Sequence, residues 1–424
     1  MQTRELAWNI LWKIFAKNKF SNQLLSNIIE QNDNFSDQDK TLIYRIVYGT
    51  LKNKLYLEYI ANQFINANKT NQKLQVLLWM SIYQFRFLDR IPNYAIVNEA
   101  VNIGKMVNSK CAGFINATLK KIFESEDSVF EINVSDEMKK LSIKYSFPSA
   151  LYLILRNEYS EDIARQVMVD SLTIPKLSFR VNTLKISRDE LLTKYPNYKL
   201  TKSLVSPVGV IADKPVVNSE MFQKGLIFVQ DEMSMRIAEV LDPYETDRVL
   251  DMCSAPGGKT THLSQLMNNK GIIHAYDISE KKINLIKMNA QRLGITNIYP
   301  HLLDAREIKT EIQYDKILCD VPCSGLGVIK RKPEIKYHTF TNQKLANLVE
   351  IQEQLLEKAY ELLKPGGILV YSTCTFGGYE NTVQIRNFLA KYDDLEIVAT
   401  EQIFGYENNN DGFYYCKIRK KISN

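Results

Sequence analysis

Apolar residues recur at every third or fourth position through most of the first 130 residues. The spacing is clear within residues 24–29 and 42–47, where each set of apolar side chains falls on one face of a helix. Ser36, followed three residues later by Asp39, is typical of a helix start. We therefore predict an almost entirely helical domain over residues 1–130.

The pattern changes between residues 131 and 230. Helical spacing continues to about residue 165, and two later stretches, 177–182 and 225–230, alternate in the way that half-buried strands do. Prolines punctuate the loops between them. Residues 131–230 are predicted to form a helical linker and a small α+β module that resembles an RNA-recognition fold.

From residue 231 onward, short apolar stretches alternate with helical ones. The predicted strands cover residues 249–253, 272–277, 297–303, 316–321 and 368–372. This alternation is typical of a mostly parallel, doubly wound α/β sheet, in which ligands bind where the strands end. Residues 231–424 are predicted to be this sheet domain.

The composition fits a globular protein without a membrane segment. The 424 residues suffice for two or three domains, and no apolar run reaches the roughly 18 residues of a membrane span. Charges interrupt the first 15 residues, unlike a secretory signal. Six cysteines in this length do not make a disulfide framework and indicate a reducing compartment, so we expect the cytoplasm. Cysteine and histidine lack metal-ligand spacing, and we expect no metal.

The net charge of +6 is modest, and it permits a nucleic-acid partner without requiring one. Most of the excess lies in residues 1–130. A basic run at residues 330–332 has two interpretations, a grip on a phosphate or an ordinary solvated run of charge. The sequence leaves both open.

One segment, DMCSAPGGKT from Asp251 to Thr260, connects a buried strand to a helix. Its paired glycines let backbone amides approach a ligand, and a helix N-terminus favours a negative group. A Walker A phosphate loop would need glycine where Cys253 stands, and a simple tight turn is a further alternative. We predict a cofactor-binding loop with the contact residues Cys253, Ser254, Ala255, Pro256, Gly257, Gly258 and Lys259.

Acidic residues stand at the ends of the next two strands. Asp277 is placed to bind the hydroxyls of a ribose and Asp304 an amine of an adenine, although either also suits a helix cap. A Gly-rich loop with two such acids fits an adenosine ligand without a triphosphate. Since the G-x-G-x-x-G of dinucleotide sites is absent from the sequence, we predict S-adenosylmethionine as the cofactor.

Two further strand ends carry cysteines. Cys323 lies in the segment DVPCSGLG (residues 320–327, the PC segment), and Cys374 lies in YSTCT (residues 371–375, the TC segment). Cysteine often only packs in a core, but these two border loops at neighbouring strand ends. They are therefore predicted to face one pocket.

A cysteine pair beside a methyl donor suits transfer to carbon 5 of a pyrimidine. Carbon 5 is a poor nucleophile until a thiolate adds to carbon 6 and creates an enamine. Cysteine supplies a thiolate near neutral pH and departs easily afterwards. An acid near ring nitrogen 3 would stabilise the adduct, and Asp320 is placed for that role.

At these segments the sequence resembles the RNA 5-cytosine methyltransferases of the NOL1/NOP2/Sun family. The resemblance rests on DMCSAPGGKT, DVPCSGLGVIKRKPEIKY, LLKPGG and YSTCTFGGYEN, and residues 44–50 resemble a NusB-like helical domain. It implies a Rossmann-like methyltransferase sheet behind an all-α NusB-like domain. It also implies that Cys374 is the nucleophile, that Cys323 assists product release, and that Asp277, Asp304 and Asp320 contact the cofactor.

The same resemblance implies a monomeric enzyme that forms 5-methylcytosine in small-subunit (16S) ribosomal RNA, with no membrane partner. Transfer RNA and large-subunit ribosomal RNA are alternative substrates for the same chemistry. A noncatalytic RNA-binding factor built around the NusB-like helices is the alternative from another class, but it leaves the two cysteine segments without a purpose.

Overall fold

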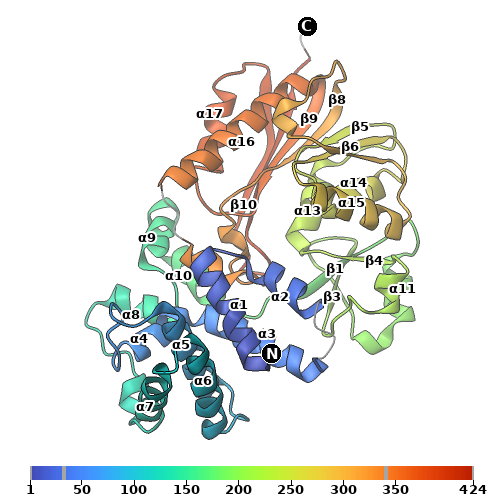
Figure 1. The fold of residues 1–424 in the computed structure, drawn as a ribbon. Helices are drawn as coiled ribbons and strands as arrows, with labels where there is room; N and C mark the ends of the chain where they lie inside the picture. Colours follow the sequence, from blue (N-terminus) through green and yellow to red (C-terminus); the bar gives the residue numbers. More distant parts are fainter. Residues whose placement is uncertain (1, 31–34, 339–341, 423–424) are drawn as a thin grey trace. The chain divides into compact units, whose positions relative to one another are not determined.

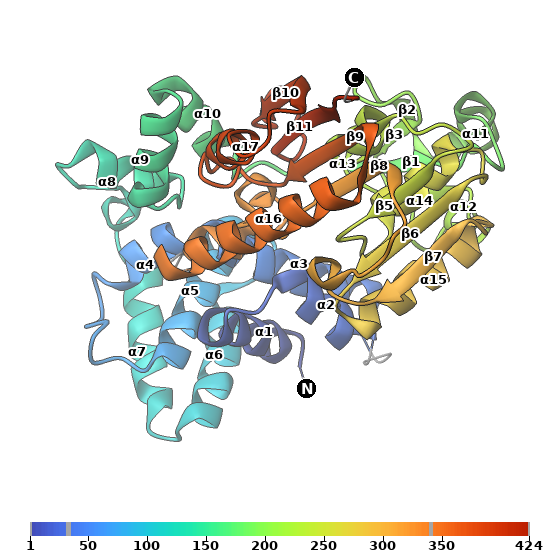
Figure 2. The same cartoon turned by 90° about the horizontal axis from the view of Figure 1, so that it is seen from above.

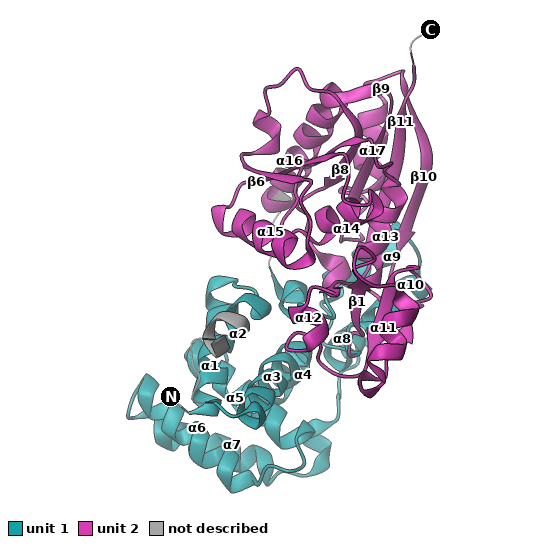
Figure 3. Ribbon diagram, turned by 90° about the vertical axis from the view of Figure 1, so that its right-hand side faces the viewer, with its two compact units in different colours: residues 1–173, 329–339 teal, residues 174–328, 340–424 magenta. Residues whose placement is uncertain are grey.

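The computed structural model describes residues 2–30, 35–338 and 342–422, and the chain forms two compact units (Figure 3). Residues 1–173 and 329–339 form the helical unit, and residues 174–328 and 340–424 form the sheet unit. The finer division into domains at residues 130 and 230 stays a prediction. The structure places the small α+β module in the same compact unit as the large sheet.

The helical unit consists of helices, as its apolar periodicity predicts (Figure 1). Ser36 and Asp39 form a capping box at the start of one of them. Residues such as Leu11, Val47 and Leu77 are fully buried in its core. The helices are α1 (Thr3–Lys17), α2 (Ser21–Glu30), α3 (Asp37–Lys52), α4 (Lys54–Ala61), α5 (Gln72–Phe87), α6 (Asn93–Val107), α7 (Cys111–Phe123), α8 (Glu137–Lys144), α9 (Ser149–Glu158) and α10 (Glu161–Asp170), with 3-10 turns η1 (Asp127–Phe130) and η5 (Pro333–Tyr337).

The basic run at 330–332 belongs to the helical unit, and its first residue is buried. Lys330 is only 3% exposed, and its ammonium lies 2.9 Å from Asp170. The Lys332 ammonium lies over the ring of Phe20. The solvated interpretation is therefore wrong for Lys330, because burial forces a lysine to find a carboxylate.

A second buried lysine, Lys336 in η5, has few polar contacts to offset the loss of hydration of its charge. The ammonium of Lys336 is 3.5 Å from the Ser171 hydroxyl and lies beside the ring of Tyr337. Burial, together with the positive charge of Lys52, lowers the pKa of Lys336 to about 7. The native state therefore carries a poorly solvated charge at neutral and lower pH.

Replacing Lys336 by Met should stabilise the protein, and more so in acid. Unfolded lysine titrates near pH 10.4, so above pH 7 the unfolded chain binds more protons than the native one and the cost of Lys336 shrinks. We expect a gain in the free energy of unfolding that is larger near pH 6 than near pH 9 by about 2–3 kcal/mol. Thermal unfolding at both pH values measures it, with the exposed Lys120→Met as control. An equal gain at both pH values would contradict this account.

The sheet unit contains a small antiparallel sheet in the order β2-β3-β1-β4. The predicted strands 177–182 and 225–230 correspond to β1 and β4, which pair with each other. The elements are β1 (Leu177–Val181), α11 (Arg188–Lys194), η2 (Pro196–Tyr198), β2 (Thr201–Lys202), β3 (Gly209–Ala212), α12 (Glu220–Gln223) and β4 (Ile227–Val229).

The large sheet has the order β10-β11-β9-β8-β5-β6-β7. The strands from β9 to β7 are parallel, as predicted, whereas β11 and β10 add an antiparallel edge. The strands are β5 (Arg248–Asp251), β6 (Ile272–Asp277), β7 (Ile298–Leu302), β8 (Tyr314–Asp320), β9 (Leu363–Thr373), β10 (Leu395–Ile403) and β11 (Phe413–Lys420).

Helices cover both faces of this sheet (Figures 1 and 2). Successive residues of one strand enter different cores: Val249 packs with α13 and α14, and Leu250 packs with α16 and α17. This is the doubly wound arrangement. The helices are α13 (Glu232–Leu241), α14 (Gly258–Leu266), α15 (Glu280–Leu293), α16 (Asn342–Leu362) and α17 (Thr382–Leu389), and short 3-10 turns η3 (Ala305–Glu307) and η4 (Leu326–Val328) follow β7 and β8.

Candidate active site

The residues predicted for the site stand at the carboxyl ends of neighbouring parallel strands. The predicted cofactor loop follows β5, the PC segment follows β8, and the TC segment ends β9. Asp320 of β8 pairs in register with Ser372 of β9, so the two cysteine segments leave the sheet side by side. The topology thus gathers segments about 120 residues apart at one edge.

The predicted cofactor loop turns sharply into α14. Gly257 has φ of 96°, a left-handed conformation that favours glycine. A Cβ on Gly258 would lie 3.2 Å from the ring of Phe228, a tight contact that favours a small residue there. The amide and hydroxyl of Ser254 both donate to the Tyr276 carbonyl and hold the loop to the end of β6.

A buried arginine from the small sheet holds the first turn of α14. The guanidinium of Arg180 donates to the Gly258 carbonyl at 2.6 Å and to the Thr261 hydroxyl at 2.9 Å. It also donates to the side-chain oxygens of Gln230 and Gln265. Burial lowers the pKa of Arg180 to about 9, and four acceptors offset its desolvation. Strand β1 therefore fixes the loop that the sequence assigns to the cofactor.

Asp251, at the end of β5, is a buried carboxyl group with one unsatisfied oxygen. Its Oδ2 accepts from the Thr260 hydroxyl at 2.7 Å, while Oδ1 has no protein partner. Burial raises the pKa of Asp251 to about 7. Buried polar atoms are normally paired, so Oδ1 is a ready acceptor for a ligand group at this strand end.

Asp320 is held from two sides. Its Oδ2 lies 2.7 Å from the ammonium of Lys259, and its Oδ1 accepts from the Ser372 hydroxyl at 2.7 Å. Burial on its own would lower the pKa of Lys259, but the charge of Asp320 and the hydrogen bond raise it. The last residue of the predicted cofactor loop and the first residue of the PC segment are thus joined by a charge pair.

The two cysteines singled out in the sequence lie together. The Sγ atoms of Cys323 and Cys374 are 3.1 Å apart, and the Cys374 amide donates to Cys323 Sγ at 3.3 Å. The hydrogen bond to Cys374, burial and nearby charge all raise the pKa of Cys323. Neither cysteine forms a disulfide bond. The structure thus brings the two cysteines together, and the pocket that they are expected to face stays a prediction.

Two of the remaining cysteines are placed for packing. Cys319 and Cys416 are fully buried in the core of the sheet unit. Burial raises the pKa of Cys253 well above its ordinary value, so this residue lines the loop as a neutral thiol.

The two acids after β6 and β7 already have partners. Asp277 accepts from the Ser279 amide at 3.0 Å, with the Lys282 ammonium at 3.5 Å. Asp304 caps η3 and forms an ion pair with Arg306. The hydrogen bonds from Arg306 lower the pKa of Asp304. The cap interpretation is correct for Asp304, and the cofactor role of both residues stays a prediction.

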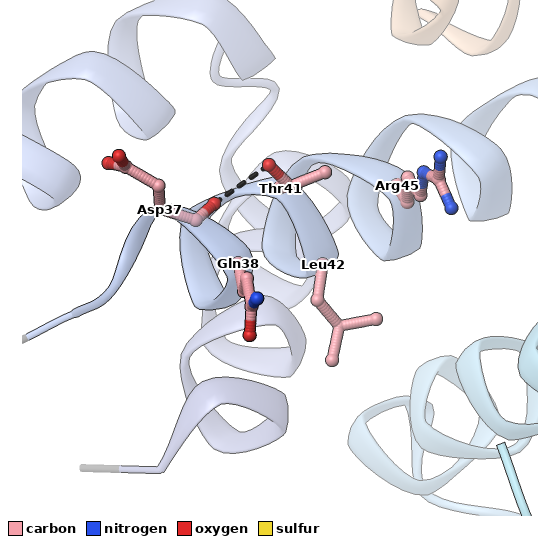
Figure 4. A pocket seen from close by; sticks show the side chains of 5 residues that line it. All are labelled: Asp37, Gln38, Thr41, Leu42 and Arg45. Carbon is pink, nitrogen blue, oxygen red and sulfur yellow. Dashed lines mark hydrogen bonds between the residues drawn. The ribbon is translucent and has the colours of Figure 1, made fainter. Parts of the chain in front are cut away.

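Surface hollows on the helical unit do not contain these residues. One of about 330 Å³ is lined by Asp37, Gln38, Thr41, Leu42 and Arg45 on α3 (Figure 4). Its charges are mixed, which favours no phosphate. Among the described residues, no helix is long and apolar enough to cross a membrane, and no cluster of three metal-binding side chains occurs in those same parts of the chain.

Comparison with known families matches both units. Residues 238–419 match the family described as 16S rRNA methyltransferase RsmB/F, and residues 1–124 match the NusB family. The resemblance and the fold predicted from the sequence, a NusB-like helical region before a Rossmann-like sheet, are thereby confirmed.

Similar proteins span nearly the whole chain. The probable ribosomal RNA small subunit methyltransferase B of Bacillus subtilis is 36% identical over 99% of this chain and 98% of its own length. The ribosomal RNA small subunit methyltransferase B of Proteus mirabilis is 32% identical over 94% of each chain.

Solved structures of other proteins also match this chain. The crystal structure of PH0851 matches with a TM-score of 0.85 and 26% identity over 99% of both chains. NSun6 from Pyrococcus horikoshii with SFG, an analogue of S-adenosylmethionine, matches with a TM-score of 0.60 and 25% identity over 65% of this chain and 99% of that one. Because more than 30% of the residues are identical over nearly the full length of the Bacillus subtilis and Proteus mirabilis relatives, this chain belongs to the RsmB/F family of 16S rRNA methyltransferases.

Proposed function

We propose that this protein transfers a methyl group from S-adenosylmethionine to carbon 5 of a cytosine in 16S ribosomal RNA, through a covalent bond between Cys374 and carbon 6. The observation that carries the proposal is the pair of sulfur atoms 3.1 Å apart, bordered by the Lys259–Asp320 pair. Membership in a family of 16S rRNA methyltransferases supports the substrate.

The residues at the end of β5 fit the cofactor. The unsatisfied Oδ1 of buried Asp251 suits an ammonium group, and the left-handed turn at Gly257 leaves the amides at the start of α14 facing a ligand. The remaining holders in this proposal are Cys253, Ser254, Ala255, Pro256, Gly258, Lys259, Asp277, Asp304 and Asp320. When bound, S-adenosylmethionine supplies an electrophilic methyl group on a sulfonium.

The protein's own groups activate and release the base. The Cys374 thiolate adds to carbon 6 of the cytosine, and Asp320 stabilises the adduct near ring nitrogen 3, so that the electron pair reaches carbon 5. Cys323 first releases its own proton to solvent, and after carbon 5 gains the methyl group the Cys323 thiolate takes the proton from carbon 5. The Cys374–carbon 6 bond then breaks, the double bond re-forms, and the thiolate leaves.

The target base must leave its stack to reach Cys374, at a cost of roughly a few kcal/mol. RNA is bound mainly by shape, phosphates and unstacked bases, and we assign this binding to the NusB-like helices and the small antiparallel sheet. The proposal is for a cytoplasmic monomer whose substrate is ribosomal RNA.

Mapping of 5-methylcytosine in ribosomal RNA tests the function. Cells that lack the protein should lose the modification at one cytosine of the small-subunit RNA, and wild-type protein should restore it. Unchanged 16S RNA with loss in transfer RNA or large-subunit RNA would overturn the substrate but keep the chemistry. No loss in any of these RNAs would contradict the proposal.

A further inference from the structure

We infer that Glu380 is a positioning residue that holds Cys323 against Cys374. Glu380 is 1% exposed and lies between the TC segment and α17. Its side chain turns toward the PC segment, where Oε1 accepts from the Ser324 amide at 2.8 Å and Oε2 accepts from the Ser324 hydroxyl at 2.5 Å. One carboxylate thus fixes both donors of the residue that follows Cys323.

The same contact reaches the TC segment through one hydroxyl. The Ser324 hydroxyl lies 2.6 Å from the hydroxyl of Thr375, the residue that follows Cys374. Because Ser324 gives its one hydrogen to Glu380, Thr375 must donate to Ser324. The chain of hydrogen bonds therefore runs from Thr375 through Ser324 to Glu380, and it pins together the residues after the two cysteines.

Neighbouring side chains hold this arrangement in place. Gln352 donates from one amide nitrogen to both Glu380 Oε1 and the Pro322 carbonyl, so α16 fixes the PC segment on the other side of Cys323. Asn381 accepts from the Thr373 hydroxyl and donates to the Thr375 carbonyl, which brackets Cys374. Glu380 and Asn381 thus each fix one cysteine segment.

These contacts explain why two sulfur atoms in the loops after β8 and β9 stay 3.1 Å apart. Glu380 holds Ser324, the residue next to Cys323, so it acts by positioning that cysteine. Its negative charge also raises the pKa of Cys323, after the larger effects of the Cys374 hydrogen bond and burial. Resting on the proposed function, the inference gives Glu380 a role in the release step, where Cys323 must reach carbon 5 of a base held by Cys374.

A thiol probe tests the positioning without any catalysis. Phenylarsine oxide condenses with two adjacent thiols, forming two arsenic–sulfur bonds and releasing water. Wild-type protein should hold the arsenical against excess monothiol, and Cys374→Ala should lose it. Glu380→Ala should weaken retention about tenfold to a hundredfold, the loss expected for groups misplaced by about an ångström. Glu380→Gln, which keeps one oxygen for the Ser324 amide, should recover most of it, and Glu396→Ala, at a partly exposed glutamate of β10, should match wild type.

Turnover gives the second measurement. Glu380→Ala should lower kcat with little change in KM for RNA, and the covalent protein–RNA adduct should accumulate. Thr375→Val removes only one hydroxyl. If Glu380→Ala does not fold, arsenical retention by Thr375→Val tests the positioning role instead. Unchanged arsenical retention in a folded Glu380→Ala or Thr375→Val protein would overturn the inference. If wild-type protein retains the arsenical but forms no 5-methylcytosine, the proposed function fails while the positioning role stands.

Discussion

Cys374→Ala is expected to reduce methylation by at least about 10⁴-fold, because removing a covalent nucleophile removes the whole route through it. Without a sulfur at carbon 6, carbon 5 of the cytosine gains no enamine character and cannot attack the methyl donor. Cys374→Ser should be nearly as inactive, since a hydroxyl is hardly ionised near neutral pH. Transfer of labelled methyl groups to 16S RNA made in cells that lack the protein measures the loss.

The variant must stay folded for this result to count. Cofactor binding by calorimetry and the thermal unfolding midpoint should both remain close to wild type, since Cys374 is only partly buried. Cys111→Ala removes another partly buried thiol, on α7 of the helical unit, and should keep full activity. Full activity in Cys374→Ala would rule out the covalent mechanism.

Cys323→Ala should behave in the opposite way and trap the reaction halfway. Methyl transfer can still occur once, but the carbon 5 proton then has no base at the position of the Cys323 sulfur, 3.1 Å from Cys374. A protein–RNA adduct should therefore accumulate to about one per enzyme. It should appear on denaturing gels as a slower band that carries the labelled methyl group.

The double variant Cys323→Ala/Cys374→Ala distinguishes this adduct from other crosslinks, because it should give no slow band. Digestion of the trapped species and mass spectrometry should place the RNA on the peptide that contains Cys374. Normal turnover of Cys323→Ala without an adduct would show that this cysteine only packs.

Sequence spacing predicted the parallel strands and the meeting of the two cysteines, because both follow from local signals. Each strand is a short apolar run, and the carboxyl ends of parallel strands must share an edge. The motif between Asp251 and Thr260 likewise predicts a sharp turn into a helix. The antiparallel edge strand β10 was not predicted, since it is partly exposed and lacks a continuous apolar run.

Other site residues could not be found in this way, because their partners are distant in sequence. Arg180 reads as one polar residue in a strand, and only the fold brings it to Gly258, 78 positions later. Glu380 stands inside the recognised YSTCTFGGYEN segment, yet its partner Ser324 is 56 residues away. Asp251 could have been identified most easily, because it is an acid at the end of a buried strand. The sequence does not show, however, that one of its carboxylate oxygens lacks a hydrogen-bond partner.

The path of the chain between the two units has a consequence for dissecting the protein. Residues 329–339 depart from the sheet unit just after the PC segment and complete the helical unit, where Glu334 accepts hydrogen bonds from the amide and hydroxyl of Ser21. A fragment ending at residue 173 would contain the NusB-family match but would leave Ser21 and Asp170 without these buried partners. The helical unit is thus discontinuous in sequence, and a boundary drawn from the family match leaves out buried residues of that unit, such as Phe147 and Ile335.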